Sequence, residues 1–197
     1  MNFIKNIFNT EDKFKFIRNI VILGVTIISV SIFFYESSKT KNSVTIQQSS
    51  LVTLNVNQLT SILSAENINP EILYFFDKEY SLVSKSWIRD TVSGKYEYFL
   101  KKLNIHIYKK ETNDCDDFVI AFYIFSRIEY KAAVKSYNSN ICVGEFVYSK
   151  TSGEVHAINI IVVLTDNVPE VLFYEPQTFS FINLTDLEKR SAKFVLF

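Results

Sequence analysis

Residues 113–128, NDCDDFVIAFYIFSRI, decide the fold expected for the second half of this chain. From Phe118 onward the apolar residues recur at spacings of three and four, which predicts an amphipathic helix. Asn113 is a good N-cap, and Asp116 stands three residues later, where a carboxylate can reach back to the cap. The pattern therefore places Cys115 in the first turn of a helix, where the helix dipole favours a thiolate.

The sequence on either side of this helix has two different periods. Upstream, residues 51–112 look mainly helical, with an apolar stripe from Trp87 to Leu103. Downstream, apolar and polar residues alternate, and this alternation predicts strands over 141–149, 155–164, 171–174, 179–182 and 193–197. Helices first and strands after indicate an α+β fold, with N-terminal helices packed on a C-terminal antiparallel sheet.

Two further blocks carry polar groups on the predicted strands, Val155-His156-Ala157-Ile158-Asn159 and Tyr174-Glu175-Pro176-Gln177. Between them, Asp166-Asn167 is typical of a hairpin turn. A two-residue turn there would put Glu175 on the same face of the sheet as His156. The carboxylate could then accept the Nδ1 proton of the imidazole and fix its tautomer. A loop one residue longer would move the carboxylate to the other face, so the prediction depends on the register.

A thiol, an imidazole and a carboxylate in this order suggest a nucleophile, its base and the group that orients the base. The chain has only two histidines and two cysteines, so one of each inside such blocks is informative. A dipole effect of about 0.3–1 kcal/mol cannot activate Cys115 alone. A protonated His156 close by could do so through an ion pair, and a cation held by the neighbouring aspartates could cancel the field that opposes the thiolate. Each residue also has a non-catalytic alternative: Cys115 as a buried structural thiol, His156 as an ordinary strand histidine, and Glu175 as a solvated residue at a strand end. Zinc ligation by the three lacks the usual ligand spacing.

The same blocks resemble the papain-like cysteine protease domain at the C-terminus of certain fungal agglutinins, which has relatives in bacteria and phages. The resemblance covers roughly residues 71–178 and implies a papain-like fold. It also implies that Cys115 is the nucleophile, His156 the general base and Glu175 the orienting group. Two positions depart from the family pattern: Val155 replaces a glycine before the histidine, and Val119 replaces an alanine in the helix. A bulky Val155 could crowd the site.

The resemblance implies calcium as a possible cofactor, because the fungal members depend on it. The acidic cluster around Cys115 fits such a requirement, although no ligands can be assigned from the sequence. The thiol chemistry itself needs no cofactor. For the oxyanion that forms in acyl transfer, the backbone N–H of Cys115 is a candidate donor.

The N-terminal region predicts a membrane anchor. Residues 19–35 form an apolar, uncharged run of about 25 Å as a helix, close to the thickness of a bilayer core. Basic residues before the run predict a cytoplasmic N-terminus, 1–18, with the rest of the chain outside. A polar tether, 36–50, would then lead to the globular domain, 51–197. The alternative is a cleaved signal peptide and a secreted protein, although small residues at a cleavage site are scarce.

These observations predict a membrane-anchored thiol hydrolase that cleaves peptide or amide bonds through an acyl-enzyme intermediate. Its partners would be a peptide or amide-bearing substrate and the membrane. Zero formal net charge and the lack of a basic stripe argue against nucleic acid. The alternatives are a catalytically inactive, membrane-tethered binding module of the same fold and a transglutaminase-like acyl transferase. Val155 favours the binding module.

Overall fold

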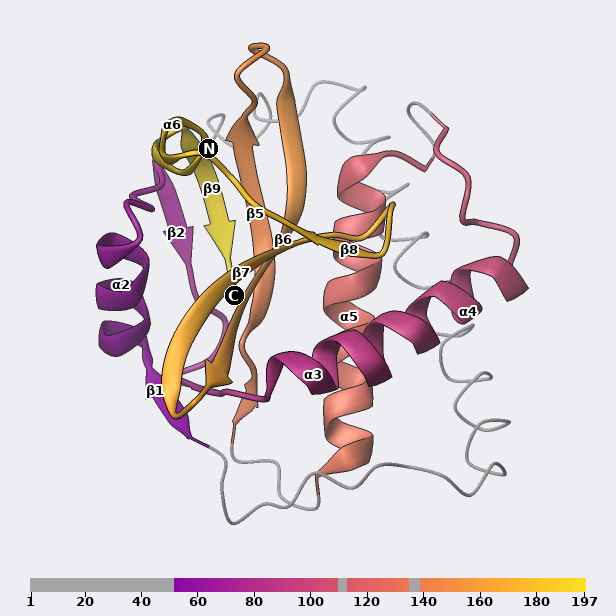
Figure 1. Cartoon of the computed structure of the whole chain (residues 1–197), viewed down its shortest axis with the longest axis horizontal. Coiled ribbons are helices and arrows are strands. Elements are labelled where there is room, and N and C mark those ends of the chain that lie inside the picture. Colours follow the sequence, from indigo (N-terminus) through magenta and orange to yellow (C-terminus); the bar gives the residue numbers. More distant parts are fainter. Residues whose placement is uncertain (1–51, 110–112, 135–138) are drawn as a thin grey trace, which may run out of the picture. The chain divides into compact units, whose positions relative to one another are not determined.

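The computed structural model describes residues 52–109, 113–134 and 139–197, which form two sheets and the helices around them (Figure 1). The larger sheet has the order β2-β9-β5-β6-β7-β8. Its strands are β2 (Ile72–Tyr74), β9 (Ala192–Leu196), β5 (Val143–Ser149), β6 (Val155–Thr165), β7 (Val168–Glu175) and β8 (Ser180–Ile182). The smaller sheet joins β1 (Thr53–Asn55), β3 (Glu79–Ser81) and β4 (Asn140–Ile141).

The hairpin between β6 and β7 has the two-residue turn that the sequence predicts. Asp166 and Asn167 both have positive φ, 50° and 64°, as a type I′ turn requires. Thr165 pairs with Val168, and the ladder continues in this register to Asn159 and its partner on β7, Tyr174. The register on which the site depends is therefore confirmed.

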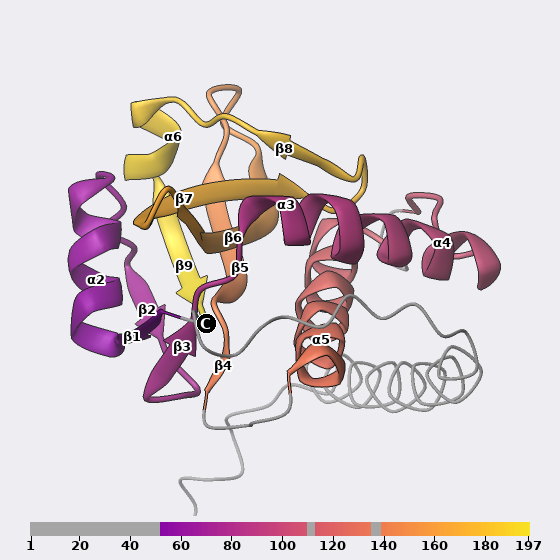
Figure 2. The same ribbon diagram turned by 60° about the horizontal axis from the view of Figure 1, so that its bottom comes forward.

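Helices cover the two faces of the larger sheet, α2 (Val56–Ala65) on one side and α5 (Cys115–Ala133) on the other (Figures 1 and 2). Alternation along β6 sends Ile158 and Ile160 into the core beneath α2. On the opposite face the ring of Phe122, from α5, stacks on Tyr174, with 4.3 Å between centroids. The long helix that carries Cys115 is therefore fixed against β6 and β7.

The predicted helix over residues 87–103 is confirmed, with an irregularity inside it. It consists of α3 (Lys85–Trp87), a π-helical segment (Ile88–Ser93) and α4 (Gly94–Lys102). The predicted stripe is buried along it except at its end, where Leu103 is exposed. Tyr96 donates from its hydroxyl to the carbonyl of Phe118 at 3.0 Å. This contact holds α4 against the start of α5.

The predicted layout of N-terminal helices on a C-terminal antiparallel sheet is wrong. The region expected to be mainly helical contributes β1, β2 and β3, and strands from both ends of the described chain share one sheet. That sheet is mixed, because β2 runs parallel to β9. The early strands are three residues long, too short to show an alternating pattern, and β2 exposes Ile72 and Tyr74 at the sheet edge. Their sequence therefore gave no strand signal.

Among the described helices, none combines the length and the apolar character needed to cross a membrane. The predicted N-terminal segment, span and tether (1–18, 19–35 and 36–50) lie outside the described residues. The start predicted for the domain, residue 51, lies just outside them as well.

Candidate functional site

Cys115 is the first residue of α5, as the sequence predicts, but the cap is one residue later than expected. Asp114, not Asn113, is the N-cap residue, and its backbone N–H donates to the carboxylate of Asp117 at 3.2 Å. The Asn113 amide instead donates to two carbonyls of the preceding loop, 105–107, at 2.7 and 2.8 Å. The thiol therefore lies at a fixed helix start, and it is partly exposed.

His156 and Glu175 meet at the ends of their strands. The Nε2 atom of His156 lies 2.7 Å from Oε2 of Glu175, and each side chain is 12% exposed. The other carboxylate oxygen accepts the backbone N–H of Gln177 at 3.2 Å. Both oxygens are therefore engaged, and the carboxylate orients the ring through Nε2. The sequence predicted Nδ1 for this role; because Nε2 takes it, Nδ1 is the ring nitrogen left for the hydrogen bond with Cys115.

The third member of the group, Cys115, lies against the same imidazole. Burial works against a charged ring, but hydrogen bonds to Cys115 and Glu175 outweigh it and raise the pKa of His156 to about 9. The ring is then positively charged at neutral pH, and a cationic imidazole beside a thiol favours the nucleophilic thiolate. The structure thus brings together all three side chains that the sequence singled out.

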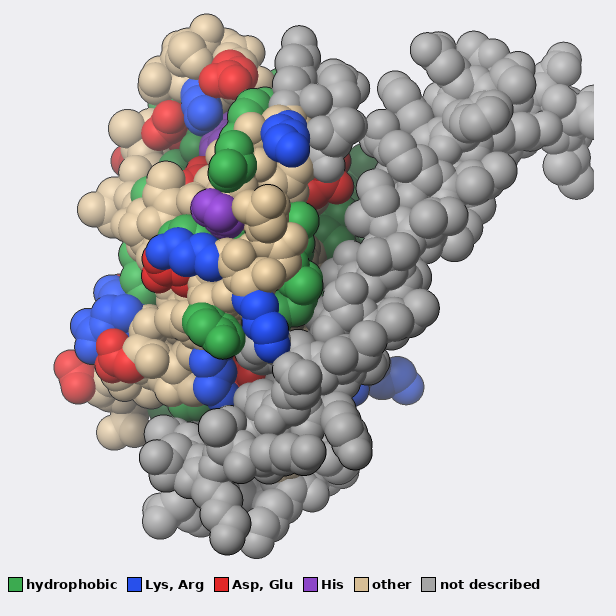
Figure 3. All heavy atoms as spheres, turned by 90° about the vertical axis from the view of Figure 1, so that its right-hand side faces the viewer, with side chains coloured by type: hydrophobic (Ala, Val, Ile, Leu, Met, Phe, Trp, Pro, Cys, Tyr) green, Lys and Arg blue, Asp and Glu red, His purple; other side chains and the backbone are tan. Residues whose placement is uncertain are grey.

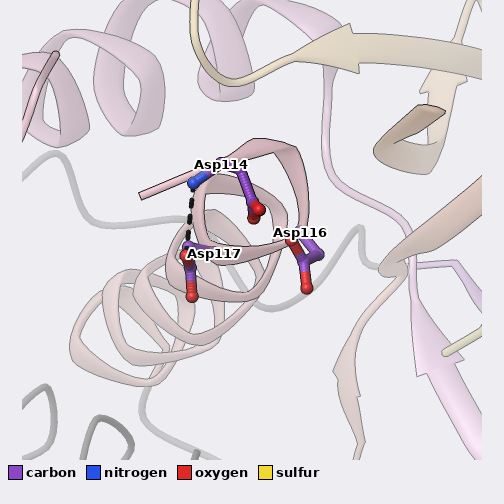
Figure 4. Close-up of side chains that lie close together, drawn as sticks. All are labelled: Asp114, Asp116 and Asp117. Carbon is purple, nitrogen blue, oxygen red and sulfur yellow. Dashed lines mark hydrogen bonds between the residues drawn. The ribbon is translucent and has the colours of Figure 1, made fainter. Parts of the chain in front are cut away.

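The aspartates at the start of α5 form a tight group around this end of the helix (Figure 4). One carboxylate oxygen each from Asp114, Asp116 and Asp117 lie within 4.8 Å of one another. A hydrogen bond with Asp114, helped by burial and by the neighbouring negative charges, raises the pKa of Asp116 to about 6. A proton shared by two carboxyls satisfies this pair without a cation, so calcium stays a prediction from the resemblance.

Glu145 on β5 adds a fourth acid that the sequence analysis missed. Burial and the negative charge of Asp116 raise its pKa to about 7. With Asp116, it carries less negative charge near pH 6 than its formal charge suggests, which weakens the field that opposes a thiolate at Cys115. A single acid inside the apolar run 141–149 was the signal in the sequence.

Tyr148 is a second neighbour that the sequence did not reveal. It pairs with His156 across β5 and β6, and the two rings make an edge contact at 6.0 Å.

The only other cysteine, Cys142, is fully buried, and burial raises the pKa of its thiol far above the usual range. Figure 3 shows one face of the molecule, where acidic, basic and apolar side chains of the described residues are mixed.

Comparison with known proteins gives a likeness of fold only. No family model matches the chain, and no curated protein matches it. Among solved structures, the PSL1a-E64 complex superposes with a TM-score of 0.58 at 24% identity, over 74% of this chain and 50% of that chain. The Polyporus squamosus lectin bound to a human-type influenza-binding epitope gives 0.56 at 21% identity, over 74% and 49%. The chain spans about half the length of these proteins.

These findings contradict the family predicted from the sequence blocks. The described part resembles about half of a lectin structure in fold, and neither a family model nor a curated protein supports a papain-like cysteine protease of the agglutinin C-terminal type. The papain-like fold class is corrected with it. The predicted thiol hydrolase and the transglutaminase-like acyl transferase rested on that family and are withdrawn with it. Three short blocks recur too easily to carry a family assignment.

The predicted partners and location need the same correction. A peptide or amide-bearing substrate rested on the protease assignment and is withdrawn with it. The membrane as a partner and a single-pass topology receive no support from the described helices. The secreted alternative is not confirmed by any of these observations. The roles of Cys115, His156 and Glu175 stay predictions, and the geometry of the three side chains is as described above.

Proposed function

We propose that the described domain is a ligand-binding module whose ligand is held at Cys115, His156 and Glu175, with the thiol as the group that reacts with it. The observation that carries the proposal is the contact chain from the thiol to the imidazole and from the imidazole to the carboxylate, 2.7 Å at its second step. A purely structural histidine has no need of a partly exposed thiol beside it.

The chemistry of such a site follows from the three groups. The imidazole takes the thiol proton, and Glu175 stabilises the resulting imidazolium. The sulfur then forms a bond to an electrophilic carbon of the ligand, and the electron pair of the bond that breaks leaves on the displaced atom. The proton on His156 is available to that atom. The result is a covalently captured ligand, and no hydrolysis is part of the proposal.

Labelling of the two cysteines tests this function. We expect iodoacetamide at pH 6 to modify Cys115 rapidly and Cys142 not at all in the folded protein, as measured by intact mass and peptide mapping. The two thiols form a matched pair, because Cys142 is buried and its pKa is raised. In Cys115→Ala the labelling should vanish, and in Cys142→Ala it should be unchanged. Slow labelling of Cys115, at the rate of a free cysteine, would contradict the proposal.

E64 serves as a second probe, because a protein of the same fold has been solved in complex with it. Supporting results are protection of Cys115 from iodoacetamide, or an added mass equal to that of the probe. If the wild-type protein neither binds E64 nor reacts with iodoacetamide, Cys115 is not a reactive group, and the proposal is overturned.

Glycan binding is a second candidate function. It is supported by the Polyporus squamosus lectin, which was solved with the epitope Neu5Aca2-6Galb1-4GlcNAc. This chain spans about half of that lectin, so the trisaccharide has to be tested on this chain directly, by calorimetry. Binding that persists in Cys115→Ala would identify a glycan site separate from the thiol, whereas absence of heat would remove this candidate.

A further inference from the structure

Asn159 occupies the point where the elements that carry the three site residues meet. It lies on β6, three residues after His156, and pairs with Tyr174, the neighbour of Glu175 on β7. It also pairs with Glu145 on β5. Its side chain faces α5, the helix that Cys115 begins, so one residue contacts every element of the site.

The amide group of Asn159 makes two hydrogen bonds across these elements. Nδ2 donates to the carbonyl of Val119 on α5 at 3.0 Å and to the carbonyl of Gly144 on β5 at 3.1 Å. Val119 follows Cys115 by one helical turn. The bond to Val119 therefore ties the helix that presents the thiol to the strand that presents the imidazole, and the bond to Gly144 fixes the orientation of the amide.

This arrangement is costly for the fold. Asn159 is completely buried, and among the described residues its Oδ1 atom has no hydrogen-bond partner. A buried acceptor without a partner costs stability, and this cost offsets part of what the two bonds of Nδ2 contribute. Stability alone therefore gives asparagine little advantage over an apolar residue here, and the geometry of the site offers a further reason for it.

We propose that Asn159 is a positioning residue, which holds α5 against β6 at the spacing that lets the Cys115 thiol meet the His156 ring. The inference rests on the proposed function, because it assigns Asn159 a role in the reactivity of that same thiol. It makes no contact with the ligand. Its effect is on geometry, and small displacements between reacting groups lower rates strongly.

The test compares stability with thiol reactivity in Asn159→Leu. The melting temperature should change little, while iodoacetamide labelling of Cys115 at pH 6 should slow by about tenfold to a hundredfold. The pH–rate profile should shift toward that of an ordinary thiol. A purely structural asparagine would leave that profile where it is in the wild type. Val163→Ala, on the same face of β6 and fully buried, is the control, with lower stability and an unchanged labelling rate.

The outcomes separate this inference from the proposed function. An unreactive wild-type Cys115 is a failure of the proposed function, whereas a reactive wild type with an equally reactive Asn159→Leu overturns the positioning role alone. Asn159→Ala is the second variant, since its small side chain cannot clash with α5. Failure of both variants to fold would also overturn the inference, because the amide would then serve the fold and not the site.

Discussion

Replacing His156 by glutamine is expected to slow the alkylation of Cys115 at pH 6 by about a hundredfold. An ordinary cysteine, with a pKa near 8.5, is well under about 1% thiolate at that pH. In the wild type the neighbouring imidazole, whose pKa is raised to about 9, is protonated and favours the thiolate. Glutamine has about the same reach and no charge. The measurement is the rate of iodoacetamide labelling between pH 5 and pH 10.

The two rate profiles should converge above pH 9. There the wild-type ring loses its proton, and the thiol of the variant ionises without help. His106→Gln is the matched control, since it makes the same exchange at the only other histidine, and its profile should follow the wild type. Equal rates for wild type and His156→Gln at pH 6 would show that the ring does not act on the thiol.

The substitution Gly144→Ala is expected to destabilise the domain by about 3 kcal/mol or more. Gly144 lies on β5 in the middle of the larger sheet. A Cβ atom there would stand 2.1 Å from the carbonyl oxygen of Leu196 on β9 and 3.0 Å from the ring of Phe197. The first neighbour is backbone and cannot move without breaking the ladder between β5 and β9. Chemical denaturation gives the free energy of unfolding.

Gly94→Ala is the matched control for this prediction. Gly94 begins α4, and nothing lies within 4 Å of the position of its Cβ. Alanine is a better helix former than glycine, so stability should be unchanged or higher by up to about 1 kcal/mol. Equal stability of the two variants would mean that β5 and β9 do not approach one another as described.

The elements with a long periodic pattern could be predicted from the sequence. The helix over 115–133, the hairpin at Asp166-Asn167 and the later strands are present, because apolar spacing and turn chemistry specify them locally. The early strands could not be predicted, since each is three residues long and the pairing of β2 with β9 joins distant parts of the chain. Such pairing is decided by tertiary packing, which no local pattern records.

The sequence indicated the three residues of the candidate site but not the residues that surround them. The order of thiol, imidazole and carboxylate singled out Cys115, His156 and Glu175, which the structure brings together, and their roles stay predictions. The sequence did not show that Nε2 faces the carboxylate, nor that Tyr148 and Glu145 approach the group, because these depend on rotamers and on the twist of the sheet. Reading a family from the same blocks went too far, because short motifs define local chemistry and not a family.

The pH titration of the His156 ring, followed by NMR, tests most directly whether the three side chains form one site. We predict a pKa of about 9 in the wild type, because the ring is held in its charged form by its two partners. In Cys115→Ala and in Glu175→Gln the pKa should fall toward the ordinary value of about 6.5. A His156 ring that titrates near 6.5 in the wild type, with the same pKa in both variants, would contradict the account.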